Sequence, residues 1–109
     1  MGALVTASVG RERRRQPRIA AAQTRWGPMA VLRPGRSVEL VDLSAAGARV
    51  RGAARLLPGR RAELQLLGPR GRCTLVAAVV YCAVTGLEPL EYSGGLCFDA
   101  ADPTLLDPG

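Results

Sequence analysis

Short runs of alternating hydrophobic and polar residues, separated by glycine and proline, make up most of this chain. Residues 37–43 (SVELVDL) and 60–67 (RRAELQLL) carry apolar side chains at alternate positions, the period of a half-buried β-strand. Residues 47–51 (GARVR) alternate in the same way, and residues 95–100 (GLCFDA) form another short apolar run. The pattern predicts a β-strand in each of these four stretches.

Three further stretches have a less simple pattern. Residues 72–83 (RCTLVAAVVYCA) are apolar on both faces, which predicts a central strand that is buried on both sides. Residues 19–25 predict a first strand, which resumes over residues 29–33 after a Gly-Pro pair. Residues 53–57 (AARLL) are open to a turn of helix instead of a strand, because Ala, Leu and Arg favour helices.

The spacing of the turn signals, about 8–12 residues, predicts an all-β sandwich or barrel. Short strands with few aromatic residues close best as a small antiparallel barrel of about six strands filled by its own side chains. Asp102 and Pro103 predict a short C-terminal helical turn, with Asp102 as its cap. The expected organisation is a flexible tail over residues 1–10 and a single domain over 11–109, with a basic arm (11–18) and a barrel (19–100).

Composition limits the chemistry that this domain can perform. The chain has 109 residues, of which 48% are hydrophobic and only 4% aromatic, so one small core of Val, Leu and Ala is expected. Its 15 basic residues are all arginine and outnumber nine acidic ones, a net charge of +6. Without Lys or His, enzymatic catalysis and a metal centre are not expected. Arginine keeps its proton and therefore binds anions rather than transferring protons.

The N-terminus and the cysteines predict a cytoplasmic protein. The first apolar stretch precedes the charged residues, the reverse of a signal peptide, and no stretch has the roughly 20 apolar residues that cross a bilayer. Cys73, Cys82 and Cys97 are odd in number and too far apart for a Cys-x-x-Cys site. They are expected to be reduced and packed as small apolar residues.

The positive charge is concentrated just before the first strand. Residues 11–18 (RERRRQPR) hold five arginines and one glutamate, which is +4 of the total of +6. Such a short cluster suits a compact anion better than a nucleic-acid duplex, along which basic residues spread. For an arginine run considered alone, a solvated arm is the alternative.

Two motifs lie at the ends of predicted strands. The first is R-x-x-x-R, formed by Arg14 and Arg18 directly before the first strand. The second is D-x-S-x-x-G, formed by Asp42, Ser44 and Gly47 between two strands. Asp42 and Ser44 are alternate residues and should point to the same side, and Gly47 should take a backbone conformation that other residues resist. The alternative is a β-turn in which the Asp and Ser side chains bond their own backbone.

Together the motifs offer complementary chemistry for a guanine nucleotide. Guanidinium groups bind phosphates through paired hydrogen bonds, pair with guanine O6 and N7, and stack on purines. A carboxylate accepts hydrogen bonds from guanine N1–H and its amino group. A ligand with guanine bases and clustered phosphates would use all of these groups.

In this order the two motifs resemble those of the PilZ domain family. Residues 57–64, 76–81 and 92–98 are similar to three further strands of that family, so the resemblance covers about residues 11–100. It implies a six-stranded antiparallel β-barrel that binds cyclic di-GMP, a bacterial second messenger. The ligand-binding residues that it implies are Arg13, Arg14, Arg15, Arg18, Asp42, Ser44 and Gly47.

The resemblance assigns roles to these residues. Arg14 and Arg18 would contact phosphates and a guanine, Asp42 and Ser44 a guanine, and Gly47 would shape the turn. An arginine at position 13 is compatible with two stacked ligand molecules. Arg11 and Arg15 also fit R-x-x-x-R, so the register of the motif stays open.

The implied function is that of a receptor for cyclic di-GMP. Binding of the dianion would order the basic arm against the barrel and present a new surface to a downstream protein. A ligand-independent PilZ-like adaptor is the alternative. Direct nucleic-acid binding is not expected, because only Trp26, Tyr81 and Tyr92 could act as stacking platforms and each could equally belong to the core. Neither a cofactor nor membrane insertion is expected.

Overall fold

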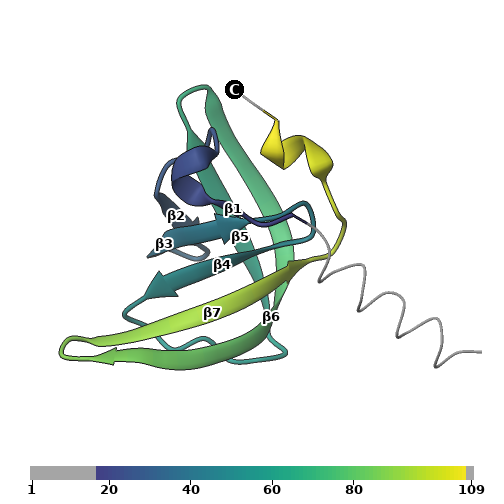
Figure 1. Ribbon diagram of the computed structural model, residues 1–109. Helices are drawn as coiled ribbons and strands as arrows, with labels where there is room; N and C mark the ends of the chain where they lie inside the picture. The colour runs from purple at the N-terminus through teal and green to yellow at the C-terminus, as the bar shows by residue number, and fades with distance from the viewer. Residues whose placement is uncertain (1–16, 108–109) are drawn as a thin grey trace, which may run out of the picture.

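The computed structural model describes residues 17–107, which form strands and two short 3-10 turns (Figure 1). The strands are β1 (Ile19–Ala20), β2 (Met29–Leu32), β3 (Arg36–Leu43), β4 (Gly47–Gly52), β5 (Arg61–Gly68), β6 (Gly71–Leu87) and β7 (Leu90–Phe98). The 3-10 turns are η1 (Ala21–Gln23) and η2 (Pro103–Leu106). Within this range no helix is long and apolar enough to cross a membrane.

Six of the strands close into an antiparallel barrel. Their order is β3-β2-β5-β6-β7-β4, and β4 pairs back onto β3 to complete the ring. The short β1 pairs with the end of β3, whereas β2 pairs with the beginning of β3. The predicted all-β class and six-stranded antiparallel barrel are therefore confirmed.

The first predicted strand, over residues 19–25, is wrong beyond Ala20. The chain leaves the sheet there and forms η1, where Ala21 O accepts hydrogen bonds from Thr24 N and Thr24 Oγ1. This detour buries Trp26, whose Nε1 donates to Leu105 O at 3.0 Å. Burial of this large aromatic side chain, with its N–H group satisfied, stabilises the conformation in which the chain leaves the sheet.

The prediction that β6 is buried on both sides is also wrong. Ala77 and Val79 point into the core, but Val76, in the part of β6 that pairs with β5, is 41% exposed and Val80 is 50% exposed. The barrel is a single layer, so the outer face of each strand meets solvent wherever nothing else covers it. Beyond the barrel, β6 and β7 continue as a two-stranded ribbon that projects at the lower left of Figure 1 and ends near Leu87, which is 77% exposed.

The core is built from alternate residues of the barrel strands and is closed by the C-terminal turn. Its largest fully buried side chains are Leu40, Leu43, Leu64, Leu66, Leu105 and Val50. In η2 the Asp102 carboxylate accepts from Thr104 N at 3.0 Å and Pro103 occupies the first turn, as predicted. The stretch 53–57 forms an irregular connection and no helical turn. The three cysteines are free and half-buried.

Candidate functional site

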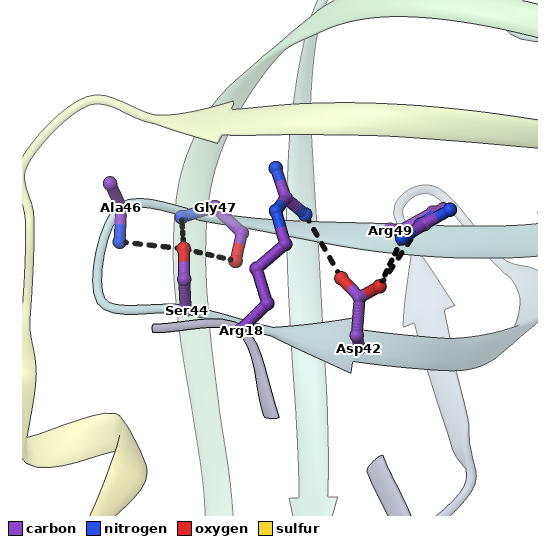
Figure 2. Close-up of polar contacts among 6 residues, drawn as sticks. All are labelled: Arg18, Asp42, Ser44, Ala46, Gly47 and Arg49. Carbon is purple, nitrogen blue, oxygen red and sulfur yellow. Dashed lines mark hydrogen bonds and ion pairs between the residues drawn. The ribbon is translucent and has the colours of Figure 1, made fainter. Parts of the chain in front are cut away.

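The pairing of β1 with β3 brings the two sequence motifs together. Ile19 lies opposite Leu43 and Ala20 opposite Asp42. Because Leu43 points into the core, the side chains on either side of it lie on the outer face of β3. Arg18 reaches over this face and its Nη1 donates to Asp42 Oδ1 at 3.0 Å (Figure 2). The implied partners Arg13, Arg14 and Arg15, and the alternative register with Arg11, lie outside the described residues.

A second arginine, which belongs to neither sequence motif, holds the other oxygen of the Asp42 carboxylate. Arg49 Nε and Nη2 donate to Asp42 Oδ2 at 3.0 and 2.6 Å. Arg49 lies directly opposite Asp42 in the β3–β4 pairing. A signal for it exists in the sequence: in a hairpin that turns at residues 44–47, the residue seven positions after Asp42 faces it.

The Asp42 carboxylate is thus a buried anchor for two cations. Asp42 is only 8% exposed, whereas the Arg18 and Arg49 side chains are about half exposed. Two guanidinium groups on one carboxylate leave this cluster with a net charge of +1. Ion pairs of this kind hold the planes of the guanidinium groups in defined orientations at the surface.

Ser44 closes the turn between β3 and β4. Its Oγ accepts from Ala46 N and Gly47 N at 3.3 and 3.1 Å, and also lies 3.3 Å from Gly47 O, to which it can donate (Figure 2). The backbone of Ser44 adds a bond from its N–H to Gly47 O at 2.8 Å. Ser44 therefore forms the turn that the sequence left open as an alternative, in which its side chain hydrogen-bonds to the neighbouring backbone.

We expect Ser44→Ala to lower the free energy of unfolding by about 1–2 kcal/mol, because two backbone N–H groups would lose their acceptor in a site that is almost fully buried. Urea denaturation followed by circular dichroism measures this loss. Ser37→Ala, at an exposed position of the preceding strand β3, is the matched control and should cost less than about 0.5 kcal/mol. Equal losses for the two variants would contradict the role of the Ser44 hydroxyl.

Gly47 is required for a reason other than the predicted one. In the described part of the chain only Gly59 and Gly71 have positive φ, so the expectation of an unusual backbone conformation at Gly47 is wrong. A Cβ at this position would overlap Leu96 O and lie 3.4 Å from Leu96 C. The glycine allows β4 and β7 to approach each other closely beside the turn.

A small hollow lies next to Arg18, with a volume of about 70 Å³. The turn at Ser44 and Gly47 borders one side, and Tyr81 from β6 borders the other. The Tyr81 ring lies against β7 at Gly95, where any Cβ would overlap the ring, and the residue is 43% exposed. Tyr81 thus belongs to the surface beside Arg18, whereas Trp26 belongs to the core.

This arrangement suits an anion that carries a flat ring. Arg18 uses Nη1 for Asp42, and its other N–H groups have no partner among residues 17–107. The Tyr81 ring offers an aromatic face within the same hollow. Within the described range no group of three or more Cys, Asp or Glu side chains is placed to hold a metal ion.

Comparison with known proteins gives no relative for this chain. No protein-family model matches it, and neither the curated proteins nor the solved structures contain a significant match. The resemblance to the PilZ family therefore rests on the motifs of the chain itself and on the barrel.

Proposed function

We propose that this protein is a PilZ-type receptor domain that binds cyclic di-GMP on the outer face of β3, beside Arg18. One observation supports the proposal above all. The last arginine of R-x-x-x-R and the aspartate of D-x-S-x-x-G, which are 24 residues apart, form an ion pair there, next to a hollow with an aromatic wall. A cation, a carboxylate and a ring at one place match the phosphates and guanine bases of this ligand.

Each group has a role in the proposed complex. Arg18 donates its remaining N–H groups to a phosphate or to guanine O6 and N7. Tyr81 stacks on a base, a contact worth about 1–3 kcal/mol in other nucleotide-binding proteins. Asp42 orients Arg18 and Arg49, and its Oδ1 can accept from a guanine N1–H when Arg18 turns towards the ligand.

The basic arm would supply the other arginine of the motif, Arg14. Arg14 precedes Arg18 by four residues, so an extended chain keeps the two Cα atoms within about 14 Å of each other. A dianionic ligand held between them neutralises part of the like-charge repulsion within residues 11–18. In the proposal, this fixes the arm against the barrel and creates the surface that a downstream protein recognises.

Titration calorimetry with cyclic di-GMP tests the proposal. We expect saturable heat and, at a ligand concentration 100 times Kd, an increase in stability of about 2.7 kcal/mol. For a domain of this size that corresponds to a rise in Tm of about 10 °C or more. Cyclic di-AMP is the control and should bind at least tenfold more weakly, because adenine lacks the O6 acceptor and the N1–H donor. Folded protein that gives neither heat nor a shift in Tm at low salt would refute the proposal.

The hydrogen bonds that Asp42 and Ser44 already make within the chain favour a second function. Both side chains are already satisfied by partners within the chain. The same barrel would then act as a protein adaptor that needs no nucleotide, with Asp42 and Ser44 stabilising the β3–β4 hairpin. If the protein is such an adaptor, cyclic di-GMP should leave Tm unchanged and give no heat of binding. One titration therefore distinguishes the two functions.

A further inference from the structure

Four arginines that are scattered along the sequence surround one hollow on the barrel surface. They come from the β2–β3 turn, the start of β3 and the β4–β5 connection, and they are Arg33, Arg36, Arg55 and Arg60. The hollow has a volume of about 370 Å³ and no carboxylate lines it. Arg61 also borders it, but its guanidinium is paired with Asp99.

Two turns hold these arginines in place. In the β2–β3 turn, Gly35 N donates to Leu32 O at 3.2 Å, and Arg33 within this turn and Arg36 directly after it both line the hollow. In the β4–β5 connection, Arg60 N donates to Leu57 O at 3.1 Å, and Gly59 at the third position has a φ of 86°, as a type II turn requires. Hydrogen bonds between this second turn and Val79 attach it to β6.

The charge around the hollow is not balanced locally. None of the four arginines forms an ion pair with a carboxylate in the part of the chain that the structure describes. Glu39 and Asp42 are paired with other arginines, and Glu63 lines an adjoining groove that Arg33 also borders, without an ion pair between the two. Four arginines without an ion-pair partner in the described residues therefore line a hollow that has no carboxylate in its own lining.

The walls of the hollow combine this charge with apolar surface. Leu32 and Val79, both buried, line it together with the half-buried Leu56, and the exposed Leu57 lies at its edge. A hollow of this volume is in the range of small-molecule sites, which are typically about 300–1,000 Å³. Cations that converge on one concave apolar site can each donate to a separate anionic group of a compact ligand.

We propose that this hollow binds a compact ligand that carries two or more phosphate groups. It is distinct from the site at Arg18, because Arg36 begins β3 and Asp42 lies six residues further along, a distance of about 20 Å in an extended strand. A nucleic-acid duplex is disfavoured because the arginines surround one point and do not form a stripe. Single-stranded nucleic acid is disfavoured because no aromatic side chain lines the hollow.

A rival basic hollow supplies the matched control. It is lined by Arg25, Arg70 and Arg72 beside Trp26 and has a volume of about 380 Å³. Arg25 is already engaged there, since its guanidinium lies 4.6 Å from the centre of the Trp26 ring and Nη1 donates to Asp107 O. One carboxylate is also near: burial raises the pKa of the Cys73 thiol, the charge of Asp102 raises it further, and the charge of Arg25 lowers it.

Amide chemical shifts of the full chain, titrated with inorganic tripolyphosphate, test the proposal. Gly59, directly before the lining residue Arg60, reports on the proposed hollow. Gly71 lines the rival hollow and Gly47 lines the hollow beside Arg18, so their amides report on those two sites. We expect the Gly59 amide to shift saturably with one dissociation constant. That constant should rise at least tenfold in Arg33→Ala/Arg36→Ala. It should change less than twofold in Arg70→Ala/Arg72→Ala, which removes the same charge.

Several results would overturn the proposal. They are no saturable shift at Gly59, equal losses in the two double variants, or a larger loss in Arg70→Ala/Arg72→Ala. Two further arms use a duplex oligonucleotide and phosphatidylglycerol vesicles. If either one binds more tightly than tripolyphosphate, and this binding is lost in Arg33→Ala/Arg36→Ala, the proposal of a compact ligand is wrong. The hollow would then bind the duplex or the lipid surface. Unchanged amide dispersion in each variant shows that it has folded.

Discussion

Gly47→Ala should lower the free energy of unfolding by about 2–4 kcal/mol, a large part of the stability of a small domain. The added Cβ would overlap Leu96 O, and because that atom belongs to the backbone of β7 it cannot rotate away. The β4–β7 pairing must therefore shift at Gly47 and Cys97, beside the turn that Ser44 closes. Urea denaturation followed by the fluorescence of Trp26, the one tryptophan of the chain, measures the loss.

The chain provides a matched control for this substitution. Gly35 has no neighbouring atom within 4 Å of an added Cβ, and its φ is not positive. Gly35→Ala should therefore change the stability by no more than about 0.5 kcal/mol, in either direction. A Gly47→Ala variant as stable as Gly35→Ala would show that β4 and β7 can separate at no cost, contrary to the packing described here.

Arg18→Ala should weaken binding of cyclic di-GMP by about 10- to 100-fold, which corresponds to the loss of a charge-assisted hydrogen bond of about 1.5–3 kcal/mol. The fold should survive, because Asp42 keeps both hydrogen bonds from Arg49 after Arg18 is removed. The Arg18 side chain is about half exposed, so little packing is lost with it. Calorimetry gives the change in affinity and a thermal melt gives the change in stability.

Arg72→Ala is the control for Arg18→Ala. It removes the same charge from an exposed position in the β5–β6 turn region, away from β1 and from the turn at Ser44. Its effect on cyclic di-GMP affinity should be less than about twofold at moderate salt, because a distant exposed charge is screened. Equal effects of the two substitutions would mean that the ligand responds to the net charge alone, and the site at Arg18 would be ruled out.

Local sequence predicted most of the strands because their burial pattern is local. In β3 and β5 the alternation of apolar and polar residues matches the inward and outward faces of the barrel. The same reasoning failed for β6, where a run of apolar residues does not distinguish a strand covered on both sides from one that faces solvent. It also failed for residues 21–25, where burial of the adjacent Trp26 against η2 competes with strand pairing.

The residues of the candidate site could likewise be predicted from the sequence only in part. The position of Arg18 before β1 and the shared face of Asp42 and Ser44 follow from short-range spacing, and both could be predicted. Arg49 could be placed only with the register of β3 and β4, and Tyr81 only with the packing of its ring on Gly95. The sequence allowed two alternatives for Ser44, one of which was hydrogen bonding to its own backbone. The backbone geometry of the turn selects that alternative.

The amino-acid sequence alone determined the all-β class, the strand periodicity, the excess of arginine and the two motifs, because each depends on residue types and on spacings of a few positions. Tertiary structure decided the rest. It set the need for glycine at position 47, through a strand about 50 residues further along the chain. It also gathered Arg33, Arg36, Arg55 and Arg60 around one hollow. Closure of a barrel brings distant residues within a few ångströms of each other, and electrostatic and steric interactions depend on that separation rather than on distance along the chain.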